Sequence, residues 1–296
     1  MRTIRSVTAL LMLLSAGAWS QSDGNKAQIS GTVFDANRAV VPNAKVKIRN
    51  TGTGLTRELI TNATGLYRAV LLDAGSYELT AESAGFAQAK VEGVYLNVGM
   101  SLGVDIALQA SATVTTIDGG ASLMNVALPA PATTINQQTI NKLPINGRRF
   151  HDLAVLTPTV QVDPQRRQLS FAGQRGINAN VMLDGADYNQ PFFGGIRGGE
   201  RASFAFTVPQ GAIQEFQVVI TGYSPEYGRS TGGVLNTITK SGSNQFHGDA
   251  FYQLRHKELG AKDPVQQIAA LETQHQWGGS VGGAIKKDKL FFFTAF

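Results

Sequence analysis

Short runs of alternating polar and apolar residues fill the first third of the chain. Residues 45–49 and 77–82 each alternate with a period of two, which is the side-chain spacing of a half-buried β-strand. Groups rich in Gly and Asn, at 51–54 and 62–65, separate such runs and supply the positive φ that tight turns need. Several strands at this spacing predict a β-sandwich over residues 27–108. The side chains predicted to fill its core are Val33, Val46, Ile48, Leu59, Tyr67, Leu79, Val104 and Ile106.

The pattern changes after the predicted sandwich. Residues 109–138 are rich in Ser, Thr, Ala and Pro, which predicts a linker. Beyond it, residues 181–183 form a short apolar strand that Asp184 and Gly185 close as a turn pair. Residues 213–220 begin with an amphipathic pattern and end in an apolar run, which predicts a segment that continues as a buried strand.

A third pattern occupies the C-terminal end of the chain. Residues 244–252 alternate bulky with small or polar side chains, and residues 274–285 do so loosely. A polar turn at 286–289 then leads into the aromatic run at 290–296. A strand, a charged turn and an aromatic strand are typical of a transmembrane β-hairpin whose aromatic residues lie at the membrane interface. We therefore predict that residues 243–296 begin an outer-membrane β-barrel.

The N-terminus has the pattern of an export signal. Two arginines precede an apolar run at 7–14, and Ala18 and Ser20 place small residues at the −3 and −1 positions of a cut after Ser20. A membrane-spanning helix needs about 20 apolar residues, so this run is too short to be an anchor. We predict a cleaved signal peptide at 1–20.

Composition narrows the classes of function. The chain has 296 residues, enough for two ordinary domains, and it is 43% hydrophobic and 16% charged with 33 glycines, which is typical of a turn-rich globular protein. Its net charge is +5, but Lys and Arg are scattered without a basic helix or a long basic run. We therefore predict no nucleic-acid partner. The absence of cysteine excludes disulfides, thiolate metal sites and cysteine nucleophiles.

One motif has the form of a catalytic site. Residues 228–232 (GRSTG) fit the Gly-x-Ser-x-Gly nucleophile elbow, in which Ser230 would be the nucleophile. That elbow needs a helix after the serine, whereas residues 233–239 are strand-forming. The four histidines lack the His-Glu-x-x-His spacing of a metalloprotease helix. We therefore predict no enzyme activity and no catalytic, cofactor-binding or metal-ligating residue. Stoichiometric labelling of Ser230 by a fluorophosphonate would favour the enzymatic alternative.

Four motifs in the first domain each combine a turn with the strand that follows it. They are residues 29–35 (ISGTVFD), 41–46 (VPNAKV), 61–67 (TNATGLY) and 74–77 (AGSY). Together they resemble the carboxypeptidase regulatory-like domain, over most of residues 27–108. The resemblance implies a prealbumin-like sandwich, a fold that proteins with many different functions share.

A longer ordered series of motifs follows the predicted linker. It consists of residues 139–144 (TINKLP), 146–153 (NGRRFHDL), 171–176 (FAGQRG), 181–185 (VMLDG), 213–218 (IQEFQV) and 227–242 (YGRSTGGVLNTITKSG). The series resembles the plug domain of TonB-dependent outer-membrane receptors of the Oar-like type, in which a carboxypeptidase regulatory-like domain precedes the plug. This resemblance covers residues 139–242 and implies an α+β plug domain. The fold class predicted for the chain is mainly β, with a sandwich, an α+β plug and the first strands of a transmembrane β-barrel.

The resemblance also implies a function, a location and partners. Such a receptor lies in the outer membrane lipid with its N-terminal domains in the periplasm. It imports a scarce small substrate (a carbohydrate, a peptide or a metal chelate) when a TonB-type energy-coupling protein displaces the plug. In these receptors the energy protein captures a short linker segment by strand pairing. Thr113, Val114, Thr115 and Thr116 are the candidate contact segment, because β-branched residues extend readily. An ordinary linker strand is the alternative.

The chain departs from this family in one respect. Residues 243–296 are too few to close a barrel of about 22 strands. We expect the chain to be a fragment of a longer protein, or else not to transport by itself. The alternative function is a periplasmic carbohydrate- or protein-binding module with a non-transporting plug. Glycan or protein binding by residues 27–108 alone would favour that alternative.

Overall fold

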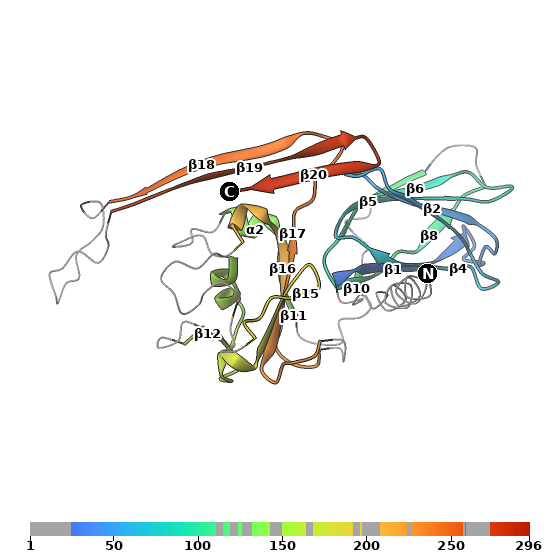
Figure 1. Ribbon diagram of the computed structural model, residues 1–296. Helices are drawn as coiled ribbons and strands as arrows, with labels where there is room; N and C mark the ends of the chain where they lie inside the picture. The colour runs from blue at the N-terminus through green and yellow to red at the C-terminus, as the bar shows by residue number, and fades with distance from the viewer. Residues whose placement is uncertain are drawn as a thin grey trace, which may run out of the picture.

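Three β-structured parts follow one another along the chain in the computed structural model (Figure 1). They are a sandwich, a central mixed sheet and a three-stranded sheet that we call the hairpin sheet. No helix in the described ranges is long and apolar enough to cross a membrane. The predicted signal peptide lies outside the described residues. The structure describes residues 25–110, 115–118, 124–125, 132–142, 150–163, 168–191, 196, 208–223, 227–256, 258 and 273–296.

The sandwich consists of two sheets. The first has the order β10 (Met124–Asn125), β7 (Ser101–Gly103), β1 (Ala27–Asp35) and β4 (Leu66–Leu72), with β8 (Ile106–Leu108) also paired to β1. The second has the order β3 (Thr56–Ile60), β2 (Lys45–Asn50), β5 (Gly75–Glu82), β6 (Ala89–Leu96) and β9 (Thr115–Asp118). In β2 exposed and buried residues alternate along the whole strand, as the sequence pattern predicts.

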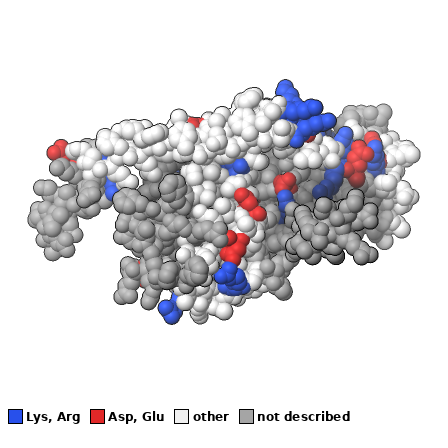
Figure 2. Space-filling view, viewed as in Figure 1, with Lys and Arg blue, Asp and Glu red and all other residues white. Residues whose placement is uncertain are grey.

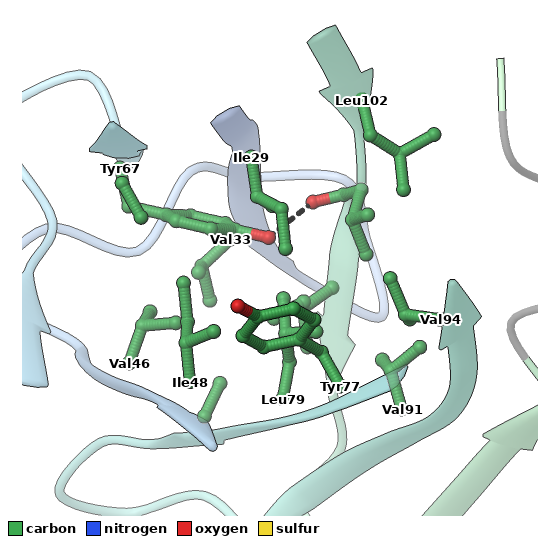
Figure 3. Close-up of a cluster of buried hydrophobic side chains, with 14 of the residues drawn as sticks. Ile29, Val33, Val46, Ile48, Tyr67, Tyr77, Leu79, Val91, Val94 and Leu102 are labelled. Carbon is green, nitrogen blue, oxygen red and sulfur yellow. Dashed lines mark hydrogen bonds between the residues drawn. The ribbon is translucent and has the colours of Figure 1, made fainter. Parts of the chain in front are cut away.

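The space between the two sheets holds the sandwich core, which Figure 3 shows in close-up. Seven of the eight predicted core side chains are buried, and Leu59 is half-buried because β3 is an edge strand. The Tyr67 hydroxyl donates to the Val104 carbonyl at 2.6 Å, so the one polar group of this ring has a partner inside the core. Burial raises the pKa of Tyr67 far above its ordinary value, with a smaller contribution from Asp105.

The central sheet combines strands that are far apart in the sequence. Its order is β11 (Ala132–Ile135), β16 (Ile213–Val219), β17 (Gly233–Thr239), β14 (Ala179–Leu183) and β15 (Ala186–Asp187), and β14 pairs with β17 in parallel. A second hydrophobic core around Phe216 and Leu235 lies against it. The elements beside the sheet are α2 (Gln137–Lys142), η4 (Phe150–Leu156), β12 (Val160–Val162), β13 (Leu169–Phe171), η5 (Gly176–Asn178) and η6 (Gln210–Ala212).

The hairpin sheet contains β18 (His247–Arg255), β19 (Gln274–Lys286) and β20 (Leu290–Ala295) in antiparallel order. These strands occupy the segments predicted to alternate at the C-terminal end. Together with the two preceding parts they confirm the mainly β fold class.

The segment predicted as a linker contributes to two of these parts. Strands β9 and β10 pair within the sandwich, and β11 pairs with β16 at the edge of the central sheet. The described residues of this segment therefore include strands where the composition predicts a linker. The central sheet begins at Ala132, before the predicted plug boundary at Thr139.

Gly31 allows strand β1 to pack directly against the backbone at Val104. A Cβ at position 31 would lie 1.7 Å from the Val104 carbonyl oxygen, which is itself the acceptor for Tyr67. We expect Gly31→Ala to destabilise the sandwich by about 3 kcal/mol or to prevent its folding, because backbone atoms cannot move aside as a flexible side chain can. Gly52→Ala is the control, since its Cβ would meet its nearest neighbour at an ordinary 3.4 Å. Equal urea midpoints for the two variants would contradict this packing.

Candidate functional site

Strand β16 is buried on both of its faces. Phe216 and Val218 point into the core of the central sheet. Glu215 and Gln217, which alternate with them along the strand, point to the opposite side. The register shifts between Ile213 and Glu215, which is the mark of a β-bulge. A bulge re-aims the side chains that follow it, so the two polar residues face the sandwich.

The sandwich meets these two side chains with a tight turn between β6 and β7. In this turn Met100 N–H donates to the Asn97 carbonyl at 3.2 Å, and Gly99 at the third position has a φ of 66°. The second residue of such a turn, Val98, uses neither its N–H nor its carbonyl within the turn. The Val98 N–H donates to Glu215 Oε1 instead.

Gln217 completes the contact on the other side of the same residue. Its Nε2 donates to the Val98 carbonyl at 3.4 Å. Two side chains of β16 thus satisfy both backbone groups of Val98, as a neighbouring strand would do. Gln214 adds a third contact between the two parts, because its Nε2 donates to the Ala74 carbonyl at 3.2 Å.

Glu215 is the most perturbed acid described in this interface. Its side chain is 0% exposed. Burial raises its pKa to about 7, and the hydrogen bond from Val98 opposes this shift without cancelling it. Tyr95 lies beside Glu215. The pKa of its phenol is also raised, mainly by burial and to a smaller extent by the charge of Glu215.

A cavity of about 630 Å³ opens between the sandwich and the central sheet, next to Gln214. Lys26 and Asp73 line it from the sandwich and pair with each other. Asp184 and Lys240 line it from the central sheet. The wall of this cavity therefore combines charged side chains from both parts with apolar groups such as Ile238.

The turn pair predicted from sequence joins β14 to β15 and is tied to β17. Asp184 and Gly185 both have positive φ, at 50° and 83°, which is the conformation of a tight hairpin turn. The Asp184 carboxylate accepts from the Thr239 N–H at 2.8 Å and from the Thr239 hydroxyl at 2.7 Å. This turn therefore fixes the end of the parallel β14–β17 pair.

The candidate nucleophile Ser230 lies in a turn that leads into a strand. Its hydroxyl donates to the Gly233 carbonyl at 2.7 Å and accepts from the Gly233 N–H at 2.9 Å. Among the described residues, this hydroxyl bonds only to main-chain groups. Strand β17 follows where a nucleophile elbow would need a helix. The described residues also include no group of three or more His, Asp or Glu placed to hold a metal ion.

The two faces of the hairpin sheet differ in chemistry. Cross-strand pairs share a face, so Tyr252 and Trp277 lie on one face, which we call the apolar face. Asp249 and Ser280 lie on the other, which we call the polar face although Phe251 and Phe293 also lie on it. The Ser280 hydroxyl donates to Asp249 across the strands of the polar face. In Figure 2 the surface of this sheet is largely uncharged. The apolar face carries Phe246, Tyr252, Leu254, Trp277, Val281, Ile285 and Phe296, each at least 44% exposed.

The predicted energy-coupling segment lies only partly within the described residues. Thr113 and Val114 are outside them. Thr115 and Thr116 begin β9, which pairs in parallel with β6 and forms an edge of the sandwich. This part of the segment is therefore already a strand, and its outer edge is the one that a further strand could join.

Sequence reasoning identified the Asp184 turn and the alternating hairpin but missed the contact at Val98. The signal available was the pair of polar residues Glu215 and Gln217, which lie two positions apart in β16 and therefore share one face of the strand. That signal does not show that a turn more than 100 residues earlier covers the polar face.

Comparisons with known proteins match the first and the last of these three parts to family models, and nearly the whole chain to one relative. The family model described as "Carboxypeptidase regulatory-like domain" matches residues 28–109, and the one described as "Outer membrane beta barrel domain" matches residues 238–296. The "TonB-dependent transporter Oar" of Myxococcus xanthus is 31% identical over 98% of this chain. The chain spans 28% of the length of that relative.

Solved structures with partial likeness include two receptors. The siderophore receptor PirA from Acinetobacter baumannii is 23% identical, with a TM-score of 0.41 over 55% of this chain and 23% of that one. PirA from Pseudomonas aeruginosa is 16% identical, with a TM-score of 0.37 over 53% of this chain and 26% of that one.

Removing the Asp184 carboxylate tests whether this turn holds the central sheet together. We expect Asp184→Ala to lower the free energy of unfolding by about 1–2 kcal/mol, because it removes two hydrogen bonds and leaves a residue that disfavours positive φ. Asp184→Asn keeps one acceptor oxygen, and asparagine tolerates positive φ. We therefore expect this variant to lower the free energy of unfolding by less than Asp184→Ala does. Asp73→Ala, at an exposed ion pair, is the control. A loss for Asp184→Ala no larger than the control would contradict this role.

Proposed function

Because the chain is a partial homologue of the TonB-dependent transporter Oar, with a carboxypeptidase regulatory-like domain and an outer-membrane barrel segment, we propose that it forms the N-terminal part of an energy-coupled import receptor. The central sheet is the plug, and the sandwich lies in the periplasm. The observation that carries the proposal is the 31% identity to a transporter over 98% of the chain. The homology is to a transporter and not to an enzyme.

The arrangement of the parts supports gating by movement of the plug. The central sheet has its own core, separate from the strands of the hairpin sheet. A body of this kind can leave a barrel without unfolding the wall around it. Displacement is a conformational step that makes and breaks no covalent bond, so it needs no catalytic residue. The imported substrate belongs to the class of scarce carbohydrates, peptides or metal chelates.

The hairpin sheet supports the placement in the outer membrane. Barrel strands alternate between lipid-facing apolar and lumen-facing polar side chains. Strands β18 and β19 alternate in this way, and the Lys240 ammonium lies 5.9 Å from the ring centre of Phe293, which pairs on the polar side. The apolar face is then the lipid face, and the central sheet lies on the lumen side.

A chimera tests the receptor proposal directly. Residues 1–296 replace the matching N-terminal part of the Myxococcus xanthus relative, and the chimera is expressed in cells that lack that protein. The proposal predicts a heat-modifiable barrel in the outer membrane fraction. A chimera that stays soluble in the periplasm, although its isolated sandwich folds, would favour the binding-module alternative.

Charge on the predicted lipid face should block assembly of this chimera. We expect Val281→Arg to lower the assembled fraction at least tenfold, because a lipid-facing Arg costs about 2–4 kcal/mol near the bilayer centre. Gln253→Arg is the matched control, since position 253 is exposed on the polar face. Heat modifiability on gels measures assembly. Equal assembly of both variants would show that this face does not meet lipid.

Proline in the candidate coupling segment should prevent capture by the energy protein. We expect Val114→Pro to weaken binding of the periplasmic domain of a TonB-type protein at least tenfold, because proline cannot donate to a strand ladder. Gly120→Pro, in the same stretch of sequence, is the control. Titration calorimetry measures the affinity. Equal affinities of Val114→Pro and the parent chain would contradict this role and would favour the alternative that residues 113–116 are an ordinary linker strand.

A further inference from the structure

The contact between Val98 and β16 has an uncompensated acid at its centre. Glu215 is fully buried, and its Oε2 has no hydrogen-bond partner among the described residues. A carboxylate taken out of water normally has a cation or several donors beside it. This acid has the single N–H of Val98.

The elements packed around Glu215 supply no compensating charge in the described part of the chain. Strands β11 and β17, which flank β16, contain no charged residue, and neither does the turn. The titratable group that faces the acid from β6 is the phenol of Tyr95. Lys90 and Glu92, also of β6, pair with each other at 2.7 Å, and Lys142 of α2 is exposed.

We propose that Glu215 and Gln217 form with Val98 a proton-controlled latch that fastens the sandwich to the central sheet. The latch is closed when Glu215 is neutral and weakened when Glu215 is ionised. It rests on this interface alone and does not depend on transport.

The direction of the pH effect follows from the two environments of the acid. Burial raises the pKa of Glu215 from 4.5 to about 7 in the closed interface, and separation would return the side chain to water. Closure is therefore strongest below the ordinary value of 4.5 and weakens as the pH rises through about 7. The closing equilibrium falls by up to about two orders of magnitude over that range.

Spin labels can follow the separation of the two parts in the full chain. The chain has no cysteine, so labels attach only where cysteine is introduced. Thr56→Cys on the sandwich and Gln161→Cys beside the central sheet are exposed positions that report the distance between them. A second pair, Thr56→Cys and Gln88→Cys, lies within the sandwich and reports its unfolding. The measured quantity is the urea midpoint of each distance change at pH 5 and pH 8.

The latch predicts a lower midpoint for the first pair at pH 8 than at pH 5. Glu215→Gln, which keeps the acceptor but not the charge, removes this shift, and Glu215→Ala lowers the midpoint at both pH values. Glu82→Gln, at an exposed acid, behaves like the parent chain. The latch is overturned if the first pair has the same midpoint at both pH values. It is also overturned if Glu215→Gln retains the shift, or if the pair within the sandwich shifts equally with pH.

Discussion

The burial of β16 between two packed layers is the constraint on which the rest of the structure depends. One face of the strand completes the core of the central sheet through Phe216 and Val218, and the other meets the sandwich at Val98. A strand covered on both sides cannot shift its register without exposing one core or breaking the other contact. This position explains why a bulge precedes Glu215 and why polar side chains are tolerated there.

The sandwich is attached at a second place, to the beginning of the hairpin sheet. Asn244 N–H donates to the Gly52 carbonyl at 2.9 Å, and Asn244 and Asp288 exchange two hydrogen bonds of 2.8 Å. Figure 1 shows the turn between β19 and β20 beside the sandwich. In the proposed receptor this end of the hairpin faces the periplasm, because the sandwich is placed there. The sandwich would then contact both the plug and the barrel wall.

The sequence allowed prediction of elements whose determinants are local. Alternation placed the sandwich core, and Asp184 with Gly185 marked a turn whose positive φ only a few residue types adopt. The short strands β10 and β11 could not be predicted, since two to four residues form a strand only when a distant partner offers its edge. The burial of Glu215 could not be predicted from the sequence for the same reason. Its polar side chain fits a solvent-facing position until a turn from another part of the chain covers it.

Amide exchange at Val98 tests most directly whether the sandwich and the central sheet form one body through β16. Val98 and Ala63 each occupy the second position of a tight turn, and Ala63 is exposed. The account predicts that the Val98 amide exchanges as slowly as the amide of Phe216 in the centre of β16, while that of Ala63 exchanges rapidly. Exchange at Val98 as rapid as at Ala63 would show that Glu215 does not hold this turn, and that the two parts are not joined at β16.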